Sequence, residues 1–189
     1  MRILVTGSNG FVGKNLIAEL RSKGHEDLSL YDIDTDPKFL DSYTKDCEFV
    51  FHLAGVNRPK DQEEFMQGNF GFTDTLLASL RMNNNTCPVL ITSSIQAELD
   101  NPYGRSKKAG EDLLFAYAKE TGASVYVFLL PNVFGKWCRP NYNSAVATFC
   151  YNIARDLPIT VNDPEVVMSL VYIDDVVQAF LSALKGDVL

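Results

Sequence analysis

The sequence predicts an α/β fold built on a doubly wound parallel sheet. Short, uniformly apolar segments alternate along the chain with longer segments whose apolar residues recur at helical spacing. The apolar segments hold too few polar residues for one face to lie in water, which is typical of parallel strands covered on both sides. Regular alternation of strand and helix also favours right-handed crossovers. Ligands of such folds bind beyond the carboxyl ends of the strands, so we expect functional residues directly after each apolar segment.

Each expected element can be placed by its own residues. The expected strands are the apolar segments 2–6, 27–32, 48–55, 88–94 and 124–131. The expected helices have apolar residues at helical spacing and cover 12–24, 63–82, 103–121 and about 176–184. Gly24 and Gly122 are placed to end two of these helices, because glycine readily adopts the left-handed backbone of a helix C-terminus.

The composition indicates a globular protein of one domain or slightly more. The 189 residues are 46% hydrophobic and 22% charged, with a net charge of -7. This acidic balance disfavours nucleic acid as a partner, because nucleic acid needs a basic surface. The sequence starts without a secretory pattern and has no apolar run of the ~18 residues that span a bilayer, so we expect a cytoplasmic protein with no membrane partner.

The cysteines give no sign of a metal site. They are widely and irregularly spaced, at Cys47, Cys87, Cys138 and Cys150. No CxxC pair is present, and the two histidines complete no ligand pattern. We therefore expect buried free thiols in a reducing compartment and no bound metal.

A glycine-rich loop follows the first expected strand and opens the first helix. Its sequence, TGSNGFVG, spaces three glycines as GxxGxxG. Glycines permit a tight turn and a close approach of backbone to a pyrophosphate, and the helix N-terminus offers free N–H groups. The loop predicts a Rossmann-like dinucleotide site, with a purely structural turn as the alternative. The expected cofactor contacts in this loop are Gly7, Asn9, Gly10, Phe11, Val12 and Gly13.

Asp32 stands at the tip of the second expected strand. It lies 19 residues beyond Gly13, where a carboxylate can accept hydrogen bonds from both adenosine-ribose hydroxyls. The same carboxylate would repel a 2′-phosphate, which favours NAD over NADP. Alternatively, Asp32, Asp34 and Asp36 form a solvated turn, and a neighbouring loop supplies a phosphate site.

Small residues and then polar residues follow the third expected strand. They are Leu53, Ala54, Gly55, Asn57 and Arg58. The small residues would let a flat cofactor lie against the backbone, and the polar ones are positioned to face the cleft. His52 lies inside the apolar segment, and we expect it to be a hydrogen-bonded core histidine rather than a catalytic one.

The fourth expected strand ends in hydroxyls, and a tyrosine and a lysine follow it. Thr92 and Ser94 lie at the strand end, and Tyr103 and Lys107 are four apart on the next helix, hence on one face. A phenol titrates near 10, so proton exchange at neutral pH requires an acidification of about 3 units, which a nearby cation can supply. Ser94 would hold the substrate oxygen. We interpret the trio as a proton relay beside a hydride carrier, although this spacing also occurs by chance between surface residues.

The motifs together resemble those of the extended short-chain dehydrogenase/reductase family of nucleotide-sugar epimerases, dehydratases and reductases. The matching segments, in the family's order, are TGSNGFVG, HLAG, TSS, YGRSK, LPNVFG and LVYIDDVVQAF. The resemblance implies that Ser94, Tyr103 and Lys107 are catalytic and that Lys107 also binds the nicotinamide ribose. It further implies that Asn132 contacts the diphosphate of a nucleotide sugar and that Pro131 contacts the cofactor.

Residues 130–163 resemble more specifically the reductase half of a bacterial bifunctional family in capsular polysaccharide synthesis, which carries a C-terminal cupin metal domain. This resemblance implies NADPH-dependent reduction at C4 of a UDP-linked 4-keto-6-deoxy-N-acetyl hexose, on the route to UDP-N-acetyl-L-fucosamine. Trp137, Arg139 and Asn143 would then line the sugar site, or else belong to an ordinary core with the neighbouring aromatic residues. Asp32 therefore favours NAD as the cofactor, whereas the resemblance favours NADP.

Two departures from the family pattern limit the chemistry. Ile95 and Gln96 follow Ser94 in place of the Asp–Glu pair of the dehydratases, which argues against elimination chemistry. The segment before LVYIDD has no arginine, so Arg139 or Arg155 would have to contact the diphosphate. A nucleotide-sugar 4-epimerase that retains its cofactor is one alternative, and a non-catalytic dinucleotide-sensing module is another.

The resemblance also predicts the organisation of the chain. We expect a dinucleotide-binding core at 1–135 and, at 136–189, a partial, truncated substrate-binding region with returning core elements. Family members continue for a further subdomain and a cupin, so we expect this chain to bind cofactor better than substrate and to be inactive as a fragment. The family commonly dimerises through the two long helices, here 63–82 and 103–121, which predicts a homodimer.

Overall fold

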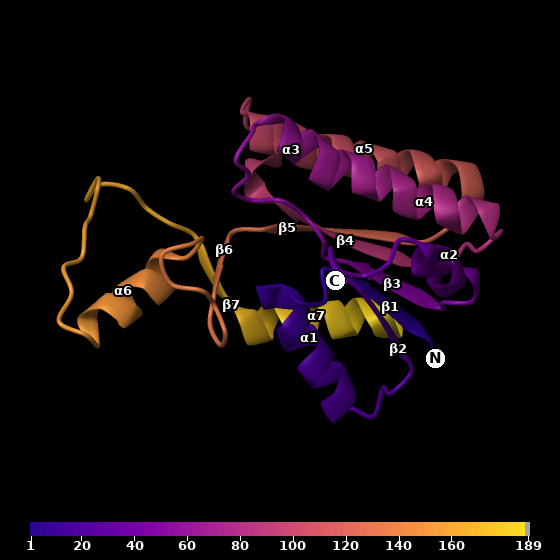
Figure 1. The fold of residues 1–189 in the computed structure, drawn as a ribbon, viewed down its shortest axis with the longest axis horizontal. Helices are drawn as coiled ribbons and strands as arrows, with labels where there is room; N and C mark the ends of the chain where they lie inside the picture. The colour runs from indigo at the N-terminus through magenta and orange to yellow at the C-terminus, as the bar shows by residue number, and fades with distance from the viewer. Residues whose placement is uncertain (188–189) are drawn as a thin grey trace.

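A five-stranded parallel sheet forms the centre of the computed structural model, which describes residues 1–187 (Figure 1). Its strands lie in the order β2-β1-β3-β4-β5. Their bounds are β1 (Ile3–Thr6), β2 (Leu28–Tyr31), β3 (Phe49–His52), β4 (Val89–Ser94) and β5 (Val125–Leu130). Because the chain starts inside the sheet and proceeds first to one side and then to the other, a topological switch point lies between β1 and β3. The predicted α/β fold and doubly wound parallel sheet are confirmed.

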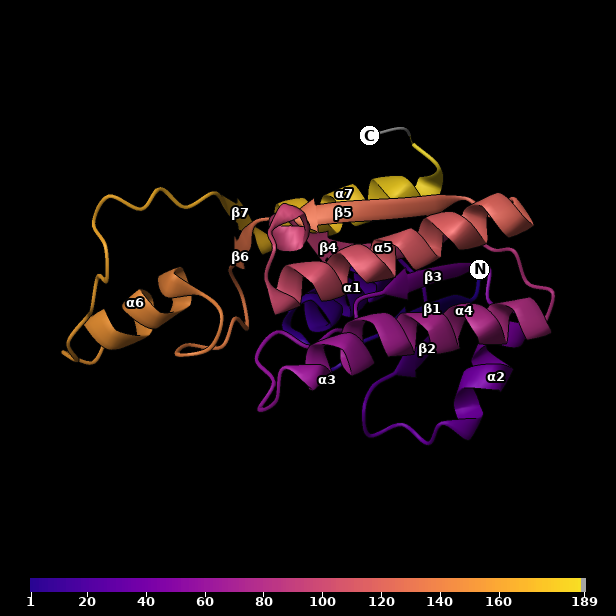
Figure 2. The same ribbon diagram turned by 90° about the horizontal axis from the view of Figure 1, so that it is seen from above.

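Helices cover both faces of this sheet (Figures 1 and 2). One face carries α1 (Phe11–Ser22) and α7 (Ile173–Lys185), and the other carries α2 (Lys38–Lys45), α4 (Phe72–Met82) and α5 (Pro102–Thr121). Each face has its own apolar core, with Phe51 and Phe180 fully buried in one and Leu76 and Tyr117 in the other. The sheet is therefore dry on both sides, as the uniformly apolar strands predict.

The predicted helix 63–82 is interrupted. It consists of α3 (Glu63–Phe65), a π-helical turn η1 (Met66–Gly71) and then α4. The turn contains Asn69, whose side chain accepts a hydrogen bond from Val56 N at 2.9 Å and donates to Val56 O at 3.1 Å. A π-helical turn shifts the register of side chains by one residue, and such turns are frequent at functional sites.

A second, smaller unit follows β5 and projects from one end of the sheet (Figure 1). It contains β6 (Asn132–Phe134) paired in parallel with β7 (Leu170–Tyr172), and between them α6 (Ala145–Ile153). Sequence periodicity missed α2, α6, the short helix η2 (Ile95–Glu98) and both of these strands. The strands are only three residues long, and the apolar residues of α6 surround the helix instead of forming one stripe, so no period marks them.

The described residues, 1–187, hold no helix that is long and apolar enough to cross a membrane. The same part of the chain holds no cluster of three or more His, Cys, Asp or Glu side chains that could bind a metal ion. Cys47 and Cys87 are buried and free, and they are neighbours in space although 40 positions separate them in the sequence.

Candidate active site

The glycine loop between β1 and α1 forms a cradle at the carboxyl edge of the sheet. Gly7 has φ +70°, and a Cβ there would lie only 2.7 Å from the Ala54 nitrogen. A Cβ on Gly13 would overlap the Gly7 carbonyl oxygen, so α1 packs directly on the loop. The first turn of α1 has no side-chain cap, which leaves its N–H groups available to an anion. The physical demands of a pyrophosphate-binding turn are therefore met.

A cavity of about 730 Å³ opens beside this loop. Its walls come from the loop, from the ends of β3 and β4, from the first turns of α5 and from the segment after β5. This volume lies within the range of ligand sites in proteins. Every site residue predicted from the sequence lines the cavity except Asp32, Ala54 and Arg58.

These three residues lie close to the cavity in supporting positions. The Asp32 carboxylate accepts hydrogen bonds from Asn9 N at 2.7 Å and Ile33 N at 2.8 Å, so it fixes the glycine loop. Ala54 packs behind Gly7, where a Cβ would meet the Ala54 backbone, and its N–H donates to Thr6 Oγ1 at 3.3 Å. The Arg58 guanidinium lies over the Tyr142 ring, which lines the cavity.

Ser94, Tyr103 and Lys107 meet at one end of the cavity. Ser94 is the last residue of β4, and the other two lie in the first turns of α5. The start of that helix is fixed by the Asn101 side chain, which accepts a hydrogen bond from Gly104 N at 2.8 Å. Lys107 Nζ donates to the Thr92 carbonyl at 3.1 Å and lies 5.9 Å from the centroid of the Tyr103 ring. The structure thus brings the predicted trio together.

The electrostatics of the trio differ from the sequence expectation. Burial raises the pKa of Tyr103, and contact with the Ser94 side chain opposes this only in part. Burial also lowers the pKa of Lys107 to about 8, although the Glu111 carboxylate acts to raise it. Burial therefore outweighs any acidifying effect of the Lys107 ammonium on the Tyr103 phenol, and that ammonium is bonded to a backbone carbonyl. The phenol stays protonated at neutral pH.

Sequence reasoning missed two buried polar residues next to the site. Glu111 is 6% exposed, lies one turn beyond Lys107 on α5, and accepts a hydrogen bond from the Ser93 hydroxyl. The signal for it was present, because Tyr103, Lys107 and Glu111 are successive i, i+4 positions on one helix face. Asn69 is 5% exposed and donates to Ser106 Oγ at 2.9 Å, but no periodicity predicts the π-helical turn that places it.

His52 is a core histidine, as the sequence predicts. It is 1% exposed, and its Nδ1 and Nε2 lie 2.8 Å from Thr6 Oγ1 and 2.9 Å from Thr73 Oγ1. Burial, and secondarily the charge of Lys107, lower the pKa of His52 to about 3. The ring is therefore neutral and holds β1, β3 and α4 together.

The outer rim of the cavity carries two arginines around one aromatic ring. The guanidinium carbons of Arg58 and Arg139 lie 5.7 Å and 5.5 Å from the centroid of the Tyr142 ring. Cation–π contacts of this kind orient guanidinium groups while leaving their N–H donors free. Local positive charge thus gathers at the mouth of a cavity in a chain with a net charge of -7.

The backbone next to this rim is strained. Trp137 lines the cavity with φ +63°, a left-handed conformation that costs a bulky residue about 1 kcal/mol or more. Two contacts hold the segment in place: Asn15 Nδ2 donates to the Lys136 carbonyl at 2.9 Å, and Lys136 Nζ lies 2.8 Å from Asp174 Oδ1. The rim is therefore tied to α1 and α7, which form part of the rigid core.

The fold and the site define a Rossmann-type nucleotide-binding protein. The chain belongs to the NAD dependent epimerase/dehydratase family, whose model matches residues 3–188. The resemblance to extended short-chain dehydrogenases found in the sequence is thereby confirmed.

The chain is similar to several known proteins. It is 50% identical over 186 residues to the UDP-2-acetamido-2,6-beta-L-arabino-hexul-4-ose reductase of Pseudomonas aeruginosa, covering 98% of this chain and 50% of that protein. It is 47% identical, with a TM-score of 0.90, to the crystal structure of the capsular polysaccharide assembling protein CapF from Staphylococcus aureus, covering 100% of this chain and 51% of that one. MoeE5 in complex with UDP-glucuronic acid and NAD matches at 25% identity and a TM-score of 0.83, over 100% of this chain and 73% of that one. The chain thus spans about half the length of the first two relatives.

Proposed function

We propose that the complete protein reduces the 4-keto group of a UDP-linked 6-deoxy-N-acetyl hexose in the cytoplasm, for capsular polysaccharide precursor synthesis. The observation that carries the proposal is the meeting of Ser94, Tyr103 and Lys107 in one cavity with the glycine loop. The 50% identity to a UDP-sugar 4-keto reductase over 98% of the chain supports the substrate class.

The glycine loop fits the phosphates of a nicotinamide dinucleotide. A Cβ at Gly7 or Gly13 would collide with backbone, so only glycines permit the tight turn that lets a pyrophosphate approach the loop closely. The uncapped N–H groups of α1 face the same cavity. Leu53, Gly55 and Thr92 would lie along the cofactor, and Lys107 would hold its nicotinamide ribose. When bound, the reduced cofactor supplies a hydride.

The protonated phenol of Tyr103 suits a reductase. Reduction of a ketone requires a proton for the forming alkoxide, and the raised pKa of Tyr103 keeps that proton on the phenol at neutral pH. Ser94 would hold the substrate oxygen, and the Lys107 ammonium would favour the phenolate left after transfer. Ile95 and Gln96 line the same cavity and carry no carboxylate for elimination.

Polar side chains on the other side of the cavity suit the nucleotide sugar. We place Asn132 and the two guanidinium groups beside Tyr142 at the diphosphate, because arginine forms paired hydrogen bonds with phosphate oxygens. Asn57, Trp137 and Asn143 would line the sugar. Arg139, the arginine suggested by the sequence, lines the cavity and is the preferred residue for this role.

The choice between NAD and NADP depends on Asp32. Its carboxylate oxygens already accept two backbone hydrogen bonds, so its negative charge is fixed at the end of β2. We propose that this charge disfavours a 2′-phosphate and selects NADH. Calorimetric titration of the wild type and of Asp32→Ala with NADH and NADPH tests this: removal of the charge should shift the affinity ratio towards NADPH by at least tenfold. A shift of twofold or less would remove Asp32 from this role.

A homodimer through α4 and α5 remains a prediction. Leu76, Leu80 and Leu114 on these helices are fully buried in the core of the chain, so they are not available to a partner. The outward apolar residue on α5 is Phe115, which is 50% exposed. Sedimentation of the wild type against Phe115→Lys tests the dimer, which should dissociate in the variant.

The direct test of the proposed function is Tyr103→Phe in the complete protein. The variant keeps the ring but lacks the proton, so turnover of the 4-keto substrate should fall by about a hundredfold to ten-thousandfold, the usual contribution of general acid catalysis. NADH affinity should change little, which separates loss of chemistry from loss of fold. Unchanged turnover would overturn the reductase assignment in favour of a non-catalytic dinucleotide-sensing module.

The epimerase alternative makes a different prediction. A 4-epimerase oxidises and re-reduces its substrate and therefore retains its cofactor between turnovers. Purified protein with free exchange of NADH and net consumption of one equivalent per product supports the reductase. Tightly retained cofactor with no net consumption would support the epimerase.

A further inference from the structure

Two cysteines lie in contact at the edge of the sheet opposite the cavity. Cys47 lies two residues before β3 and Cys87 two residues before β4, and these strands are neighbours in the sheet. Their Sγ atoms are 3.6 Å apart, and the residues are 3% and 9% exposed. Since both thiols are free, the fold has brought together two distant sulfurs that no spacing in the sequence connects.

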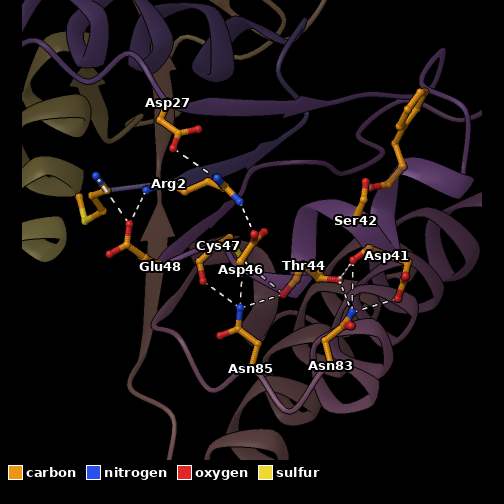
Figure 3. A network of polar contacts seen from close by, with 12 residues as sticks. Arg2, Asp27, Asp41, Ser42, Thr44, Asp46, Cys47, Glu48, Asn83 and Asn85 are labelled. Carbon is orange, nitrogen blue, oxygen red and sulfur yellow. Dashed lines mark hydrogen bonds and ion pairs between the residues drawn. The ribbon is translucent and has the colours of Figure 1, made fainter.

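The Asn85 side chain holds the two loops that carry these cysteines. Its Nδ2 donates to the Thr44 carbonyl and to the Cys47 carbonyl, each at 2.8 Å (Figure 3). Its Oδ1 accepts from Cys87 N at 2.9 Å. One amide therefore bridges the backbone of both cysteines. The sulfur-to-sulfur contact thus depends on how Asn85 positions both loops and not on two independent side chains.

The two thiols differ in chemical character. The hydrogen bond from Cys87 lowers the pKa of Cys47, and the same contact together with burial raises the pKa of Cys87. Asn85 Nδ2 also lies 3.6 Å from Cys47 Sγ and favours negative charge there. Cys47 is therefore the nucleophile of the pair, because the thiolate is the reactive form of cysteine.

We propose that Cys47 and Cys87 are a site of reversible oxidation, at which a small peroxide converts the two thiols into a disulfide that ties the amino ends of β3 and β4. A disulfide needs its sulfurs about 2.05 Å apart, so they must approach by about 1.5 Å, which side-chain rotation and small loop shifts can provide. Because both sulfurs are buried, only an oxidant as small as hydrogen peroxide can reach them.

The proposed chemistry balances in two steps. The Cys47 thiolate attacks one peroxide oxygen and breaks the O–O bond, which gives a sulfenic acid and, after protonation, one water. Cys87 sulfur then attacks the Cys47 sulfur, the S–O bond breaks, and a second water leaves. Two thiols lose two protons and two electrons, and one peroxide is reduced to two waters. A dithiol reductant reverses the reaction by thiol–disulfide exchange.

The test uses the double variant Cys138→Ser/Cys150→Ser, which retains only the buried pair. After hydrogen peroxide treatment, unfolding in denaturant with a maleimide should leave both remaining cysteines unlabelled, and the intact mass should fall by two hydrogen atoms. The disulfide would close a loop of about 40 residues, so Tm should rise by about 5–15 °C and return after dithiothreitol.

Two further readouts decide the proposal. Peptide mapping of oxidised wild type should recover a linked pair of peptides that contain Cys47 and Cys87. Cys87→Ser in the same background should instead accumulate oxidised Cys47 without a crosslink, and if that variant does not fold, the wild-type map decides alone. Full labelling of both cysteines after oxidation, or crosslinks only between chains, would overturn the proposal.

Discussion

The two ends of β3 and β4 contrast sharply in how their polar groups are used. At the carboxyl ends, Thr92, Ser94 and Lys107 line an open cavity, and the buried ammonium has a strongly lowered pKa. At the amino ends, Asn85 bridges two backbone loops, and Arg2 pairs with Asp27 and Asp46 (Figure 3).

Polar groups at the amino edge of the sheet therefore serve stability, and those at the carboxyl edge serve function. A buried charge with no carboxylate in hydrogen-bonding contact destabilises the fold, and proteins retain such groups where a ligand needs them. A closed hydrogen-bond network stabilises the fold and offers nothing to a ligand. We therefore expect substitutions at the carboxyl edge to change activity more than stability, and substitutions at the amino edge to do the reverse.

The largest expected effect is that of Lys107→Met. In the complete protein, turnover should fall by at least a hundredfold, while the fold is stabilised at pH 7. The folded-state pKa of about 8 lies below the ordinary value of 10.5, so the unfolded chain binds more protons between these values, and wild-type stability rises with pH across this window. The variant should gain about 1–3 kcal/mol at pH 7, after allowance for the lost Thr92 hydrogen bond, and nothing above pH 10.5.

Urea unfolding at pH 7 and pH 10 measures this gain. Lys108→Met is the matched control, because Lys108 is exposed on the same helix and pairs with Asp112 at 2.7 Å. A Lys107→Met chain less stable than wild type at pH 7 would contradict the view that the carboxyl edge carries destabilising charge.

Asn85→Ala should show the opposite behaviour. It removes three backbone hydrogen bonds at the amino edge, at a cost of about 2–3 kcal/mol in the free energy of unfolding. NADH affinity should stay within twofold of wild type, because the cavity is at the other edge. Equilibrium unfolding and calorimetry measure the two quantities, with the exposed neighbour Thr86→Ala as control. Lost affinity with intact fold would show that the two edges are coupled.

The smallest expected effect is the acid sensitivity caused by His52. Its pKa is about 3 in the folded chain and near 6.5 when unfolded, so the unfolded chain binds the extra proton as pH falls through this range, and stability is lost. Between pH 6.5 and pH 5 the loss from this group is about 2 kcal/mol. His52→Gln keeps hydrogen-bonding groups without a titratable ring, so its unfolding free energy should change less over this range. An equal loss in both chains would contradict the assignment.

Much of this structure was predictable from local patterns. The uniformly apolar strands, the helices around them and the glycine loop each carry their own signal, because burial and backbone conformation are constraints on neighbouring residues. Residues after each strand were expected at one edge, and nearly all of them line one cavity. The paired strands β6 and β7 escaped prediction because their pairing joins residues distant in sequence. Helix α6 escaped because its apolar residues form no single stripe.

Local patterns in the chain are sufficient to predict the parallel sheet, the cradle at Gly7 and Gly13, and the shared helix face of Tyr103 and Lys107, since periodicity and glycine geometry are local properties. Three contacts appear only once the chain is folded: Lys107 bonds to the Thr92 carbonyl, Asn69 reaches Val56 from a π-helical turn, and Cys47 meets Cys87. Hydrogen-bond partners, pKa values and sulfur contacts depend on which distant segments pack together, and no local pattern in the chain encodes that.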